Sequence, residues 1–162
     1  MKKRGTQLTA RAGEHLVTSE LNKRGYFATP FAGSVPEFDV IAVDENFKTI
    51  PIQVKTARDK SFWWLGDARN WMRIDDSTEG EQKVLGLKEI ERPDLIYFFV
   101  NLEPVEFYMM RKRELQKILY EGYESYLKHL GGKRKSFSLG ISAKSLKGFK
   151  EFKDNWTIFE EV

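Results

Sequence analysis

Hydrophobic and polar residues alternate along this chain with two different periods. In residues 8–24 and 112–130 the apolar positions recur every three or four residues, which is typical of helices with one buried side. In residues 38–43 and 49–55 they alternate, which is typical of strands, and the polar turn between them predicts an antiparallel hairpin. In chain order, the predicted elements are a helix over 8–24, strands over 26–29, 38–43, 49–55, 94–102 and 106–110, a helix over 112–130, and a short helical or irregular aromatic cap over 149–159.

This order of elements predicts an α/β fold, with helices packed on a central mixed sheet. A length of 162 residues favours one domain. We expect its core to occupy about 8–58 and 94–130, with an excursion over about 56–92 and a basic, aromatic tail over 131–162. The excursion lacks a clear period, and we expect a short helix near 85–90 within it.

The excursion interleaves cationic and aromatic side chains, and two roles are open to its tryptophans. Aromatic side chains can stack on unpaired bases while arginines hold the backbone. Alternatively, the tryptophans pack the excursion onto the sheet, which we favour because three exposed tryptophans would form an unusually large apolar patch. The residues concerned are Trp63, Trp64 and Trp71.

The amino-acid composition argues against a membrane-spanning protein, a disulfide-bonded protein and a zinc protein. Hydrophobic residues make up 41% of the chain, enough for a core, and no apolar run is long enough to span a membrane. The absence of cysteine excludes disulfides and thiolate metal sites and fits a cytoplasmic protein. With two histidines in the whole chain, we do not expect a histidine-rich zinc site.

The net charge of +3 is modest, but its distribution is uneven. Between positions 133 and 153 basic residues greatly outnumber acidic ones, which favours binding of a polyanion such as nucleic acid. The alternative is a lysine-rich surface exposed only to solvent. The residues that we expect to contact nucleic acid are Lys133, Arg134, Lys135, Lys144 and Lys147.

Three polar residues interrupt the predicted hairpin. Asp39 is a lone carboxylate in an apolar strand, while Gln53 and Lys55 are two residues apart and so point to one face of the next strand. Burying such groups is costly unless they are used, and Mg²⁺ with a phosphate would use them. The alternative is ordinary: an aspartate that accepts hydrogen bonds from a turn, a polar residue on a sheet face, and a surface lysine.

A further acid lies in the first predicted helix. Glu14 shares a side of this helix with Ala10, Val17 and Leu21, where an acidic residue is out of place. Its carboxylate is either aimed at the strands that follow or partly exposed at the edge of the apolar side. In the first case, we expect all four polar residues to share one face.

An acid on a helix, an acid on a strand and Gln-x-Lys on the next strand resemble, in order and spacing, the PD-(D/E)XK nuclease superfamily. This superfamily includes many restriction endonucleases, archaeal Holliday-junction resolvases and Mrr-like restriction enzymes. The resemblance covers about residues 8–58. It implies a restriction-endonuclease-like α/β sandwich and metal-assisted hydrolysis of nucleic acid, with DNA as the expected substrate, Mg²⁺ or Mn²⁺ as cofactor, and a homodimer for paired cuts of a duplex.

The resemblance also implies roles for individual residues. Asp39 looks like the metal-binding aspartate, Gln53 stands at the position of the second acid, and Lys55 stands at that of the motif lysine. Glu14 is similar to the helix glutamate, and the carbonyl of Val54 would be a further metal ligand. The chain departs from the usual motif in two ways: Phe38 precedes Asp39 where proline is usual, and Gln53 replaces an acid, so it would give the metal less negative charge.

Two other functions remain open. Because Gln53 is neutral, the chain could be a catalytically silent nucleic-acid-binding module of the same fold. It could also be a protein-interaction or immunity-type domain without a role on nucleic acid.

Overall fold

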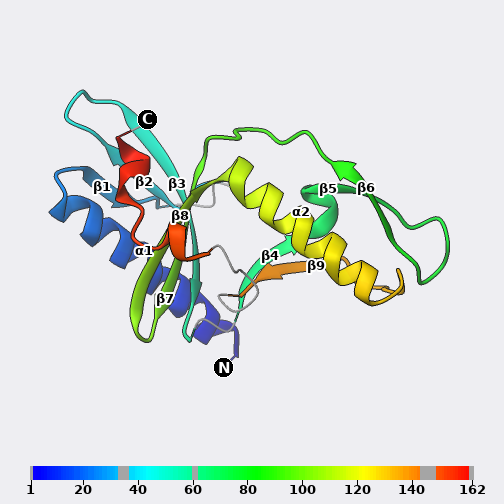
Figure 1. The fold of residues 1–162 in the computed structure, drawn as a ribbon. Coiled ribbons are helices and arrows are strands. Elements are labelled where there is room, and N and C mark those ends of the chain that lie inside the picture. Colours follow the sequence, from blue (N-terminus) through cyan, green and yellow to red (C-terminus); the bar gives the residue numbers. More distant parts are fainter. Residues whose placement is uncertain (1, 33–36, 60–61, 143–148, 161–162) are drawn as a thin grey trace.

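The centre of the fold is a five-stranded mixed sheet in the order β1-β2-β3-β7-β8 (Figure 1). The structure is a computed structural model that describes residues 2–32, 37–59, 62–142 and 149–160. β3 pairs antiparallel with β2 and parallel with β7, which confirms the predicted hairpin and the mixed α/β class. The strands are β1 (Phe27–Pro30), β2 (Val40–Val43), β3 (Thr49–Ala57), β7 (Ile96–Leu102) and β8 (Val105–Arg111).

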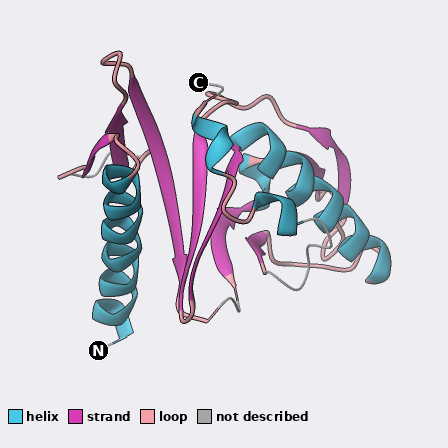
Figure 2. Cartoon of the chain, turned by 60° about the vertical axis from the view of Figure 1, so that its left-hand side comes forward, coloured by secondary structure: helices cyan, strands magenta, loops and turns pink. Residues whose placement is uncertain are grey.

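One face of this sheet is packed against the first helix, α1 (Lys2–Lys23), which runs beside the long strand β3 in Figure 2. Val17 and Leu21 are fully buried in a cluster with Ile52 of β3, as the helical pattern predicts. The helix passes very close to β3 at Gly13, where an added Cβ would lie 1.9 Å from the Thr56 hydroxyl oxygen. Only glycine permits this approach.

Trp156 and Phe159 of the C-terminal segment close the same face, whereas Phe152 packs against the cluster on the other face. The 3₁₀ helices η2 (Phe149–Phe152) and η3 (Trp156–Phe159) confirm the predicted short cap. The Phe159 ring packs on Phe98 of β7, with their centroids 6.0 Å apart, and on Tyr26.

The other face is covered by α2 (Lys112–His129) and two small antiparallel sheets. Trp63 and Trp71 are buried there, and the Trp63 indole donates to the carbonyl of Val100 at 3.0 Å. Packing is therefore confirmed for these two tryptophans, whereas Trp64 is exposed beside Phe62. The small sheets pair β4 (Trp63–Asp67) with β9 (Ser138–Ile141), and β5 (Met72–Asp75) with β6 (Lys83–Leu87); η1 (Ala68–Asn70) follows β4.

The short helix predicted near 85–90 is wrong, because these residues begin in β6 and continue as a loop. Half-buried and exposed residues alternate along β6, and the strand forms backbone hydrogen bonds with β5 along one edge. A single isolated helical turn would leave most of these groups unpaired. The described residues include no helix long and apolar enough to cross a membrane.

Candidate functional site

The strand β3 extends beyond its neighbour β2, and Asp39 lies where β2 begins. The first residue of β2, Val40, pairs with Ile52, whereas β3 continues beside β7 as far as Ala57. The Asp39 amide donates to the carbonyl of Ile52 at 2.9 Å, and its carboxylate accepts from the amide of Val54 at 2.9 Å. The Asp39 carboxylate therefore takes the place of a strand partner at the open side of β3.

Gln53 and Val54 place further polar groups beside this carboxylate. The Gln53 side chain is 8% exposed, and its amide donates to the Asp39 carboxylate. In an antiparallel pair, the N–H and C=O of one residue point the same way. Since the Val54 amide faces Asp39, its carbonyl also points to the open side of β3. Asp39, Gln53 and Val54 thus bring a carboxylate, a side-chain amide and a backbone carbonyl together.

Lys55 follows on the same face of β3 as Gln53 and is half-buried. Its ammonium makes no ion pair with a described residue. A lysine beside a carboxylate in this position can contact a phosphate without first breaking an internal pair.

Glu14 approaches β3 from the other side of the sheet. It is 9% exposed on the side of α1 that packs against Ile52 and Val54, and its carboxylate accepts from Arg11 at 2.8 Å. Gln53 and Lys55 alternate with these strand residues, so they point away from α1. The expectation that all four polar residues share one face therefore differs from the structure, and Glu14 can meet the others only around the open side of β3.

Next to Glu14, the helix leaves a polar atom without a partner. Gly13 lies against Thr56, the residue after Lys55, and the Thr56 hydroxyl is buried with no hydrogen-bond partner among the described residues. Such groups are rare in folded proteins and are associated with functional sites or bound water.

Sequence reasoning missed Tyr97, which lies beside Gln53 in the register of β3 and β7. Its ring packs edge-on against Trp71 with their centroids 6.0 Å apart. Burial, reinforced by the negative charges of Asp39 and Glu37, raises the pKa of the Tyr97 phenol to about 12. The phenol therefore stays protonated and can donate near this site. In the sequence, Tyr97 belongs to an apolar run and cannot be told from a core aromatic residue.

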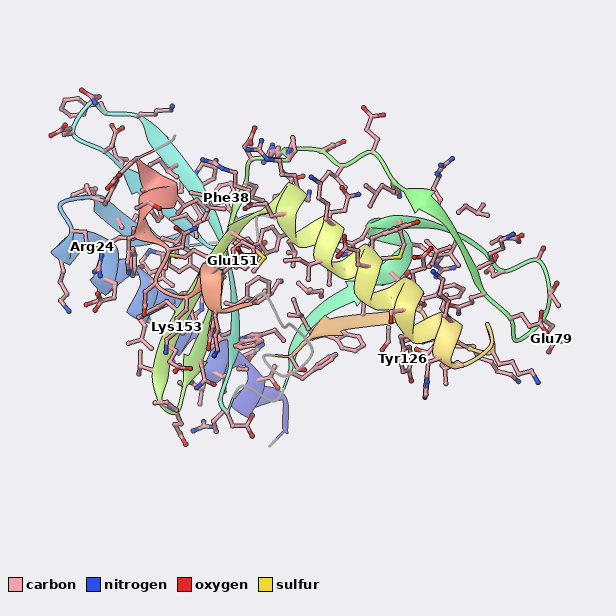
Figure 3. All side chains as sticks on the ribbon, in the orientation of Figure 1. Arg24, Phe38, Glu79, Tyr126, Glu151 and Lys153 are labelled. Carbon is pink, nitrogen blue, oxygen red and sulfur yellow. The ribbon has the colours of Figure 1, made fainter. Side chains whose placement is uncertain are left out.

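The described part of the basic segment, Lys133 to Lys135, lies away from this site. The Arg134 guanidinium stacks over the rings of Tyr123 and Tyr126, at 4.7 and 5.1 Å, and donates to the carbonyl of Ser138. Lys133 and Lys135 are exposed, while Lys144 and Lys147 lie outside the described residues. Figure 3 shows Tyr126 well away from Phe38, the residue before Asp39. The part of this segment around Arg134 is therefore not part of the Asp39 site.

Comparison with known proteins concerns the fold as a whole. A solved structure of a bacterial homing endonuclease, I-Ssp6803I, matches with a TM-score of 0.54, over 96% of this chain and 93% of that one. The chain has an endonuclease-like fold. Sequence identity is 12%, so the likeness concerns the fold alone. No protein-family model matches the sequence, and no curated protein does.

Proposed function

We propose that the chain is a metal-dependent endonuclease of the PD-(D/E)XK type that hydrolyses phosphodiesters in nucleic acid, with DNA as the expected substrate. The observation that carries this proposal is the contact of Asp39 with Gln53 and Val54 beside Lys55, at the open side of β3. The endonuclease-like fold supports it.

The residues present fit a small divalent ion such as Mg²⁺ or Mn²⁺. Asp39, Gln53 and Val54 would hold the ion, with Glu14 as a second carboxylate from α1. No group of three or more histidine, aspartate or glutamate side chains within the described residues could form an all-protein cage. Mg²⁺ uses one or two carboxylates and keeps positions for water and phosphate, so the proposed site does not require such a group. When bound, such an ion polarises a phosphate oxygen and lowers the pKa of a bound water.

The chain's own residues have separate roles in this proposal. Asp39 is held in place by the Val54 amide, so its carboxylate is preorganised. Lys55 stabilises the negative charge that builds on the phosphate oxygens during hydrolysis. The phenol of Tyr97 stays protonated well above neutral pH and is available as a hydrogen-bond donor.

The organisation of the chain is part of the same proposal. Residues 8–58 and 94–130 form the core of a single endonuclease-like unit, to which the excursion over 56–92 and the tail over 131–162 are added. Paired cuts of a duplex would require a homodimer with two such sites.

The test is cleavage of plasmid, single-stranded and branched DNA with Mg²⁺ or Mn²⁺, compared with EDTA. We expect wild-type cleavage that needs the ion, and a loss of at least about a hundredfold in Asp39→Asn and Lys55→Ala. Lys83→Ala, at an exposed position on β6, is the matched control and should cleave as wild type does. Thermal unfolding checks that each variant is folded.

Cleavage that persists in both Asp39→Asn and Lys55→Ala would contradict the proposed mechanism. Salt-sensitive binding without any cleavage would favour the silent binding module, for which the neutral Gln53 is the specific observation. An absence of binding to DNA and RNA at low salt would favour the protein-interaction domain.

A further inference from the structure

A groove of about 700 Å³ lies between α2 and the strand β9, which run beside each other in Figure 1. One wall is formed by residues of α2 between 118 and 129, and the other by residues 138–142 together with Phe62. The described lining residues include the cationic side chain of Arg134 and no aspartate or glutamate. The groove therefore suits a ligand that combines negative charge with apolar surface.

Two exposed aromatic rings, those of Phe62 and Trp64, form an aromatic platform at this groove. Phe62 is 48% exposed and Trp64 is 57% exposed, and their ring centroids are 6.1 Å apart. Trp63, between them, is buried. Because side chains alternate along a strand, Phe62 and Trp64 both lie on the outer face of β4 while Trp63 anchors the strand to the core. The platform thus presents ring surface to a planar ligand.

The Phe62 ring is held in place by the backbone of β9. Gly140 is the strand partner of Trp64, and an added Cβ at Gly140 would lie 2.0 Å from Cζ of the Phe62 ring. Only glycine leaves room for the ring to rest on the strand here. A ring that is already fixed by packing loses little side-chain freedom when a ligand stacks on it.

The α2 wall adds an aromatic ring and a cation. Tyr126 is 50% exposed, and the Arg134 guanidinium lies 5.1 Å from its ring centroid. One amino group of Arg134 donates to the carbonyl of Ser138 at 2.6 Å, and the guanidinium makes no ion pair with a described carboxylate. A guanidinium has further N–H donors, so Arg134 can contact a phosphate without first breaking a salt bridge.

The platform lies on the same side of the large sheet as Lys55. In the register of β3 and β7, Lys55 is beside Phe99, and the Phe99 ring packs edge-on against Trp63 with their centroids 5.8 Å apart. Ala57, two residues after Lys55, belongs to the same buried cluster as Trp63. A nucleic-acid strand that leaves Lys55 across this face therefore comes to the platform.

We propose that the groove binds an unpaired segment of the nucleic acid, with a base stacked on Phe62 and Trp64 and a phosphate at Arg134. This inference rests on the proposed function and names its substrate class: single-stranded or branched rather than continuous duplex. Unpaired bases can stack on aromatic side chains, whereas the bases inside a duplex stack on one another. Such stacking tolerates any base, so we expect no sequence preference from it.

The test measures binding of labelled oligonucleotides by fluorescence anisotropy in EDTA, where cleavage does not interfere. Phe62→Ala should weaken binding of a single strand by about tenfold and leave the affinity for a continuous duplex within about twofold. Trp64→Ala should give a smaller loss. Phe27→Ala is the matched control, because it removes an exposed ring from β1, at an edge of the large sheet, and should bind as wild type does.

An oligonucleotide that keeps its phosphates but lacks its bases separates stacking from charge. Wild type and Phe62→Ala should bind this abasic strand equally. Arg134→Gln should weaken binding of both the normal and the abasic strand, and should lower the slope of log affinity against log salt by about 0.7. Thermal unfolding checks that each variant is folded.

Equal single-strand affinity in wild type, Phe62→Ala and Trp64→Ala would overturn the inference, as would an equal loss in Phe27→Ala or an equal loss for the duplex. Self-association of the wild type that Phe62→Ala abolishes, with unchanged oligonucleotide affinity, would assign the platform to a second copy of the chain and also overturn it.

The two proposals fail separately. Single-strand binding that depends on Phe62, with no wild-type cleavage, refutes only the endonuclease. Cleavage that is lost in Asp39→Asn, with normal single-strand binding by Phe62→Ala, refutes only the groove as a site for unpaired bases.

Discussion

Buried polar side chains have different partners in the α2 region and at the open side of β3. In the α2 region, Gln116 donates to the carbonyls of Trp71 and Lys88, at 2.7 and 2.6 Å, and so fixes the β5–β6 segment against the helix. At β3, Gln53 instead contacts the carboxylate of Asp39. Gln116 therefore gives two backbone carbonyls a hydrogen-bond donor. Gln53 instead lies beside a negatively charged carboxylate, close to the backbone of Val54. The partner of a buried glutamine, rather than its burial, distinguishes a structural role from a candidate site.

The two helices also differ in how closely they approach their neighbours, and this difference gives the largest expected effect on stability. Gly13→Ala in α1 should destabilise the fold by about 3 kcal/mol, because the new methyl group would overlap the Thr56 side chain. Gly122→Ala in α2 is the matched control. No atom lies within 4 Å of its added Cβ, so the change should stabilise by up to about 1 kcal/mol.

Chemical denaturation of both glycine variants measures these changes. Combining Gly13→Ala with Thr56→Gly should restore part of the lost stability, since the overlapping side chain is removed. Equal stability of the Gly13→Ala and Gly122→Ala variants would contradict the close approach of α1 to β3.

Replacing Gln116 and Gln53 in turn tests the comparison itself. Gln116→Ala should lower stability by about 2 kcal/mol, because the carbonyls of Trp71 and Lys88 lose their donor, and should leave cleavage by the folded protein unchanged. Gln53→Ala should lower cleavage by about tenfold and stability by less than about 1 kcal/mol. Unfolding curves measure the stability of both variants, and initial rates measure their cleavage. A loss of cleavage in Gln116→Ala together with unchanged cleavage in Gln53→Ala would contradict the roles given to the two glutamines.

A smaller effect, confined to alkaline pH, is expected from Tyr97. Its raised pKa means that the folded protein holds the phenol proton more tightly than the unfolded chain does. The resulting stability, about 1 to 2 kcal/mol, is complete below about pH 10 and is lost as pH rises toward 12. In Tyr97→Phe, the free energy of unfolding should therefore decrease less between about pH 10 and 12 than it does in the wild type, as measured by urea unfolding. Tyr126→Phe, at an exposed position, should show the same decrease in the free energy of unfolding as the wild type.

The sequence predicted the sheet and the two long helices because their patterns are regular and their partners are close in sequence. The β2–β3 hairpin is the clearest case: one turn joins two alternating strands, so the closeness of Asp39 to Gln53 follows from local pattern alone.

Contacts between distant segments escaped prediction, and so did one local strand pair. β6 was mistaken for a helix although its partner β5 is close in sequence, because a short apolar run does not distinguish a strand from a helix. The position of Tyr97 beside Gln53 depends on the parallel register of β3 and β7, which no local pattern encodes. The side of the sheet from which Glu14 approaches is set by the packing of the whole of α1, and its apolar pattern is the same for either side.

Binding of Mn²⁺ to the folded protein, followed by isothermal titration, tests most directly whether the oxygens around Asp39 form a metal site. We predict one site in the wild type, at least about tenfold weaker binding in Asp39→Asn because a neutral amide replaces the charged ligand, and unchanged binding in Gln116→Ala. Equal Mn²⁺ affinity in wild type and Asp39→Asn would contradict the account.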